Sequence, residues 1–134
     1  NTARRSVFLT FVLMVLITSA CKKQPENRAG KLPESVQTYV YGFTSGIISK
    51  ANPIRVRFTD AVVDSTQVGE TAKSIISFEP SISGQAFWED AKTLRFDPEE
   101  SLNSGTTYIA TVELGKIVKG VPKDAQSFQF DFRT

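Results

Sequence analysis

Several residue types that carry chemistry are absent or rare in this sequence of 134 residues. It contains no histidine, one cysteine, one tryptophan and one methionine. The lack of histidine excludes a serine–histidine–aspartate triad and a zinc site built from the usual cysteine and histidine ligands. The single cysteine excludes an intramolecular disulfide, so the fold must depend on its apolar core. We therefore expect no enzyme activity, no metal site and no cofactor in this chain.

An excess of one charge sign is also missing once the first residues are set aside. The chain has 16 Lys and Arg against 14 Asp and Glu, and Arg4 and Arg5 account for the difference. The rest of the chain is therefore balanced and offers no basic surface of the kind that binds nucleic acid. We predict that nucleic acid is not a partner.

Residues 1–20 have the layout of an export signal. Basic residues precede an apolar run over 7–17, and small residues then lead to Cys21. The run is too short for a transmembrane helix, which needs about 20 apolar residues. The small residues before the cysteine resemble the bacterial lipobox, although Thr18 stands where that box usually has leucine. By this resemblance, Cys21 becomes the lipid-modified first residue of the mature chain, and the lipid attaches the protein to a membrane.

Residues 21–35 are predicted to form a flexible tether. They are mostly polar and contain no aromatic residue, so they have little apolar surface to offset the entropy of ordering. Together with the signal, the tether predicts an exported protein that is lipid-anchored in the bacterial cell envelope. Lys22 follows the cysteine, where an aspartate would indicate retention in the inner membrane. We therefore expect the outer membrane, on its periplasmic or surface face.

Apolar and polar residues alternate along much of the remaining chain, 36–134. This period of two is typical of antiparallel strands with one buried and one wet face. The clearest alternating stretches are 54–58, 94–97, 108–114 and 128–133, and less regular strands are expected over 36–43, 74–78 and 83–88. Residues 60–73 are expected to form a long loop or a short helix. About seven strands separated by turn residues predict an all-β antiparallel sandwich of the immunoglobulin or fibronectin III type.

The segment 102–108 resembles the tyrosine corner of such sandwiches. Leu102 and a turn at Gly105 precede Tyr108, which opens the next predicted strand. In a tyrosine corner the hydroxyl group ties the turn to its own strand. We therefore expect Tyr108 to have a structural role.

Three further groups of residues could carry chemistry, and each also has a structural interpretation. Carboxylates in turns could bind calcium, which needs six or more oxygen ligands, or could serve glycoside hydrolysis as an acid and base pair. A tryptophan at a strand end could form a platform for a sugar. The residues are Glu89 and Asp90 with Asp60 or Asp64 for calcium, Glu99 and Glu100 for hydrolysis, and Trp88 for the sugar. We favour solvated turns for the carboxylates and a core position for Trp88.

The order and spacing of several segments resemble the bacterial Ig-like module of surface proteins. These segments are 53–58, 78–80, 84–90, 93–98 and 102–108. With Leu-Gly-Lys at 114–116 and the lipoprotein signal, the sequence is similar to the N-terminal region of bacterial alpha-2-macroglobulin-like lipoproteins, especially those of the Bacteroidetes type. The resemblance implies a long string of sandwich domains that traps proteases. In some members an internal Cys-Gly-Glu-Gln thioester holds the target, and this sequence does not contain that motif.

The macroglobulin resemblance implies that 36–134 is a non-catalytic scaffold domain of a membrane-anchored endopeptidase inhibitor. Its partners would be the following domains of the same chain and, through the whole protein, proteases. One alternative is an Ig-like binding or spacer module of a surface adhesin or carbohydrate-capturing lipoprotein. Another is a module in front of a catalytic domain. Asn1 is not an initiator methionine and Thr134 directly follows a strand-like run, so we expect a piece of a longer protein.

Overall fold

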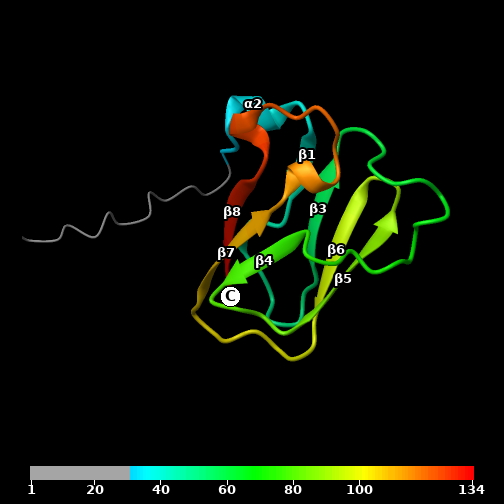
Figure 1. Cartoon of the computed structure of the whole chain (residues 1–134). Coiled ribbons are helices and arrows are strands. Elements are labelled where there is room, and N and C mark those ends of the chain that lie inside the picture. Colours follow the sequence, from blue (N-terminus) through cyan, green and yellow to red (C-terminus); the bar gives the residue numbers. More distant parts are fainter. Residues whose placement is uncertain (1–30) are drawn as a thin grey trace, which may run out of the picture.

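The structure of the protein is a computed structural model, and the residues that it describes are 31–134 (Figure 1). The signal and most of the predicted tether, including Cys21, lie outside the described residues. In chain order the elements are α2 (Glu34–Gln37), β1 (Val40–Phe43), β2 (Gly46–Ile47), β3 (Ile54–Phe58), β4 (Ile76–Glu79), β5 (Gly84–Asp90), β6 (Thr93–Pro98), β7 (Thr107–Val112), the 3-10 helices η1 (Leu114–Lys116) and η2 (Lys123–Ala125), and β8 (Phe128–Arg133).

The strands form two four-stranded sheets that make a sandwich. The first sheet has the order β1-β3-β6-β5, and the second has the order β2-β8-β7-β4. All neighbouring strands are antiparallel except β2 and β8, which are parallel. The predicted all-β immunoglobulin-like sandwich is thus confirmed. Its strand number rises to eight because the chain between residues 40 and 47 contributes one strand to each sheet.

The alternating residues of the sequence correspond to inward and outward side chains. Burying apolar surface contributes about 25 cal/mol per Å², so each strand turns its apolar positions toward the other sheet. The buried inward residues of the four regular strands are Ile54, Val56 and Phe58 in β3, Leu94 and Phe96 in β6, Tyr108, Ala110 and Val112 in β7, and Phe128, Phe130 and Phe132 in β8. The outward positions of β3 and β6 carry charged residues instead, Arg55 and Arg57 in β3 and Arg95 and Asp97 in β6.

Aromatic rings fill much of the space between the sheets. Phe130 lies 4.8 Å from Phe43 between ring centroids, and Phe132 stacks on Tyr108 at 5.5 Å. Trp88 is only 5% exposed and lies 6.2 Å from Phe58. Its core position is therefore confirmed. A buried tryptophan cannot serve as a sugar platform.

The tyrosine corner is present at the predicted position. The Tyr108 hydroxyl accepts a hydrogen bond of 3.1 Å from the backbone N–H of Asn103, and the turn passes through Gly105 in the left-handed region, at φ 65°. The ring of Tyr108 is buried against Phe132, so the hydrogen bond joins the turn directly to the core.

Replacing Tyr108 with phenylalanine should destabilise the domain by about 0.5–1.5 kcal/mol. The change removes the hydroxyl acceptor and leaves the N–H of Asn103 without this partner, while the ring can stay in place. The measurement is the urea midpoint of unfolding. Tyr41→Phe is the matched control because Tyr41 is 78% exposed, and an equal loss in both variants would contradict the corner's structural role.

The start of the domain differs from the prediction. Residues 36–43 were expected to form a strand, but Glu34–Gln37 form the short helix α2 and the strand begins at Val40. Pro33 is the N-cap residue of this helix, and its carbonyl accepts hydrogen bonds from the N–H groups of Val36 and Gln37. Leu32 and Val36 are both buried, so the packed domain already includes the last residues assigned to the tether.

The segment before β4 also differs from its prediction. The strand expected over 74–78 runs instead from Ile76 to Glu79. Ser74 has a φ of 57°, a left-handed conformation that is incompatible with an extended strand. The preceding stretch, 60–73, is the predicted long loop, and a single bridge joins its Thr71 to Phe87 in β5. No helix among residues 31–134 is long and apolar enough to span a membrane.

Candidate functional site

The outer face of the first sheet carries a connected set of charged side chains. Glu89 in β5 accepts two hydrogen bonds of 2.9 Å from Arg55 in β3, through Nε and Nη2. The same carboxylate accepts a bond of 3.1 Å from Nη1 of Arg95 in β6. Arg95 in turn donates through Nε to Asp97 at 2.7 Å. The four residues thus form a continuous chain of ion pairs across three strands.

The register explains why this network is needed. Arg55 and Arg95 lie directly opposite each other in neighbouring strands, and like charges in that position repel. The negative carboxylate of Glu89 binds both arginines and so offsets their repulsion. The hydrogen bond from Arg55 and, after it, the one from Arg95 lower the pKa of this carboxyl group. The same bond from Arg55 to Glu89 raises the pKa of Arg55. Glu89 therefore acts as a bridge between the two arginines.

The Glu89→Gln variant should be less stable than the parent by about 1 kcal/mol at pH 7, because these side chains are partly exposed and water screens them. A carboxyl with a lowered folded pKa stabilises the fold above its unfolded pKa, about 4.3, and that stabilisation disappears as the pH falls through the folded pKa. The difference between variant and parent should therefore shrink below pH 4. Urea midpoints at pH 7 and pH 3 test this, with the exposed Glu100→Gln as the control. A pH-independent difference would refute it.

The residues weighed as candidate calcium ligands are not gathered into a metal site. Glu89 is engaged with two arginines, and the side chain of Asp90 accepts a bond from the backbone N–H of Lys92 at 2.7 Å. Within residues 31–134, no group of three or more metal-binding side chains is placed to hold an ion. The turn carboxylates near β5 therefore have structural partners.

A second pair of residues on the same outer face is arranged differently. The guanidinium carbon of Arg57 in β3 lies 5.9 Å from the ring centroid of Tyr41 in β1, which is within range of a cation–π contact. Tyr41 is 78% exposed, the highest value among the large aromatic residues of residues 31–134. Arg57 forms no ion pair with any residue in this part of the chain.

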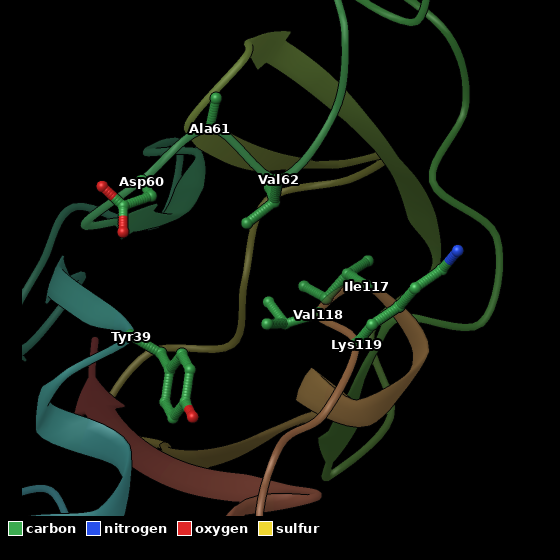
Figure 2. Close-up of a pocket in the computed structure, with 7 residues that line it drawn as sticks. All are labelled: Tyr39, Asp60, Ala61, Val62, Ile117, Val118 and Lys119. Atoms are coloured by element: carbon green, nitrogen blue, oxygen red, sulfur yellow. The ribbon is translucent and has the colours of Figure 1, made fainter.

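A shallow cavity lies at the end of the sandwich that carries the long loop after β3 (Figure 2). Its volume is about 250 Å³, and it is lined by Tyr39, Asp60, Ala61, Val62, Ile117, Val118 and Lys119. In Figure 2 the side chains of Val62, Ile117 and Val118 face the opening, whereas the charged ends of Asp60 and Lys119 point away from it. Ligand pockets usually measure about 300–1,000 Å³ and contain converging polar groups. This cavity has an apolar floor and lacks such convergence.

A smaller cavity of about 180 Å³ lies beside the tyrosine corner. Its lining includes Ser81, Ser83, Glu100 and Tyr108. The Tyr108 hydroxyl is already engaged with Asn103, and Glu99 does not line the cavity. Glu99 and Glu100, which were considered as an acid and base pair, therefore do not line either cavity together.

Comparison with protein families gives one match, a model described as the bacterial Ig-like domain, over residues 33–134. The match covers both sheets and begins one residue before α2. This chain belongs to the bacterial Ig-like domain family. The Ig-like module expected from the sequence is thus confirmed. A comparison with curated proteins found no match.

Solved structures with the same fold include two L,D-transpeptidases of Mycobacterium tuberculosis. L,D-transpeptidase 3, in complex with a faropenem-derived adduct, is 16% identical with a TM-score of 0.50, and the match covers 72% of this chain and 37% of that one. Another L,D-transpeptidase, from strain H37Rv, is 15% identical with a TM-score of 0.50, covering 72% and 40%. At this level of identity the similarity shows the Ig-like fold alone. This chain spans about two fifths of the length of those enzymes.

The arginine-rich outer face of this Ig-like domain was not predicted from the sequence. The signal was present, since Arg55, Arg57 and Arg95 occupy the polar positions of alternating strands. What was missing was the pairing register, which decides that Arg55 faces Arg95 and that Arg57 lies beside Tyr41. The proposed lipid site, Cys21, lies outside the described residues and stays a prediction.

Proposed function

We propose that the Ig-like domain is a non-catalytic scaffold that links a lipid anchor on Cys21 to following domains of a longer bacterial envelope protein. The observation that supports this role is the placement of the two ends of the described chain (Figure 1). The chain enters beside α2, which packs against η2. From η2 the strand β8 runs to Thr134 at the opposite end of the sandwich.

This two-ended arrangement suits a spacer. The six residues of β8 extend over about 20 Å, which is the distance that the domain would place between its two neighbours. The absence of histidine from the whole sequence and the lack of converging polar groups in the larger cavity agree with a role without catalysis.

We further propose that the longer protein is an endopeptidase inhibitor of the alpha-2-macroglobulin type. The support is the segment order over 53–58, 78–80, 84–90, 93–98 and 102–108 together with the lipoprotein-like signal before it. The test is to sequence the gene downstream of Thr134 and to assay the encoded protein for protease trapping. Repeated sandwich domains and a protease that stays active on small substrates but not on large ones are the expected results. A catalytic domain directly downstream would refute the inhibitor assignment.

The anchor has its own test in the Cys21→Ala variant. We expect this change to move the protein from the membrane pellet to the soluble fraction and to abolish labelling by radioactive palmitate, because each buried CH₂ of an acyl chain contributes about 0.8 kcal/mol to membrane binding. The change Gln24→Ala leaves the cysteine in place and serves as the control. Continued membrane attachment of Cys21→Ala would show that the lipid does not hold the protein.

A further inference from the structure

Two of the three arginines on the outer face of the first sheet have carboxylate partners, and the third, Arg57, has none among the described residues. Arg55 and Arg95 both bind Glu89, and Arg95 also binds Asp97, so these two arginines and two carboxylates form a complete network. Arg57 lies two residues from Arg55 on the same face of β3 and has no carboxylate partner among the described residues. A carboxylate supplied from outside would give Arg57 the kind of partner that Arg55 and Arg95 already have.

Tyr41 is presented beside this arginine by an irregularity of the edge strand. The register of β1 against β3 shifts between Val40 and Gly42, so Tyr41 is the extra residue of a β-bulge. Bulges bend an edge strand and redirect a side chain, and they are frequent next to functional sites. Here the bulge leaves the ring of Tyr41 78% exposed with the guanidinium of Arg57 over it.

We propose that Tyr41 and Arg57 form the centre of a binding surface for a polypeptide partner that presents a carboxylate beside apolar side chains. The carboxylate would pair with the guanidinium of Arg57, whose planar fork matches carboxylate geometry. The apolar side chains would cover the exposed ring of Tyr41. Tyrosine and arginine are the residue types that, with tryptophan, dominate the energetics of protein interfaces.

The shape of the face favours a polypeptide over a small ligand or a sugar. Small-molecule sites are concave, and neither of the two cavities described above includes Tyr41 or Arg57. The surface around these residues is the outer side of a sheet, with the closed ion-pair network of Glu89 beside it. Such a network can act as the polar rim that surrounds the centre of an interface. This binding role is independent of the proposed spacer role, since a domain can separate its neighbours without any partner on its sheet face.

The experiment uses the intact protein as the cell makes it, purified in detergent. The probe is a fluorescently labelled peptide in which aspartate alternates with valine, and the matched peptide has asparagine in place of aspartate. Binding is followed by fluorescence anisotropy at low salt and at high salt. The variants are Arg57→Gln and Tyr41→Ala, and the control is Arg133→Gln, which removes another exposed arginine from the second sheet. Thermal unfolding of each variant confirms that the fold is retained.

The expected result is binding of the aspartate peptide that weakens by about tenfold in Arg57→Gln and in Tyr41→Ala and is unchanged in Arg133→Gln. The asparagine peptide lacks the carboxylate, so its affinity for the parent protein should be no higher than the affinity of the aspartate peptide for the Arg57→Gln variant. No binding at millimolar peptide, or binding that Arg57→Gln leaves unchanged, would overturn the proposal. Polygalacturonate binding more tightly than the peptide, through Arg57, would overturn the assignment to a polypeptide in favour of an acidic glycan.

Discussion

Replacing Phe132 with alanine should cost about 3–5 kcal/mol of folding free energy, which is much of the 5–15 kcal/mol that stabilises a typical domain. Phe132 is 1% exposed and lies in β8 between β2 and β7, opposite Gly46 and Tyr108. Its ring stacks on Tyr108 at 5.5 Å and meets Phe78 edge-on at 6.3 Å. The truncation therefore leaves a cavity at the point where the second sheet, its short parallel strand and the tyrosine corner meet.

Urea unfolding followed by the fluorescence of Trp88 measures this loss. Phe87→Ala is the matched control, because Phe87 lies on the outer face of β5 with Arg95 5.4 Å from its ring centroid. That variant removes the same number of atoms from a half-exposed site, so its urea midpoint should fall much less. Equal losses in the two variants would mean that the core around Phe132 is not the main source of stability.

The Gly84→Ala variant should be the second most damaging change, with a cost of about 1–3 kcal/mol. A Cβ at Gly84 would lie 2.3 Å from the backbone oxygen of Asp97 and 2.7 Å from the ring of Phe96. The oxygen belongs to the backbone of the partner strand β6, so it cannot move aside without disturbing the pairing of β5 and β6. The added methyl group must therefore displace one strand from the other.

Gly42→Ala is the control for this change. Gly42 also lies in a strand of the first sheet, but a Cβ there would meet no atom within 4 Å. Its stability should stay close to that of the parent protein, or rise slightly because alanine restricts the unfolded chain. Thermal unfolding of both variants gives the comparison. A parent-like Gly84→Ala would show that β5 can shift along β6 at little cost.

The fold was largely predictable because one physical cause dominates it. Each regular strand buries one face, and this requires apolar and polar residues to alternate along the sequence. The buried residues Phe128, Phe130 and Phe132 are an example. The elements that were missed are those set by local backbone preferences or by pairing. The helix α2 depends on Pro33, the late start of β4 depends on Ser74, and β2 exists only because two residues reach the edge of β8.

The candidate surface was less predictable because it depends on contacts between strands distant in sequence. Arg57 and Tyr41 meet only through the register of β1 against β3 and the bulge in β1. In the same way, the sequence alone predicts that Glu89 is a carboxylate in a turn. Its binding to both Arg55 and Arg95 depends on the register that places these two arginines opposite each other. Residue type and spacing identify the charges but do not pair them.

The parallel pairing of β2 with β8 bears on how the domain would respond to mechanical tension. The helix α2 and the strand β1 precede β2, and β8 is the last strand before Thr134, so tension that passes β1 and reaches β2 draws two parallel neighbours in opposite directions. Their hydrogen bonds are then loaded in shear and must break together, along with that from the N–H of Ile48 to the carbonyl of Arg133. Force-induced unfolding is governed by the rate of barrier crossing. The short parallel pair of β2 and β8 therefore sets a barrier to unfolding under tension applied between the two ends.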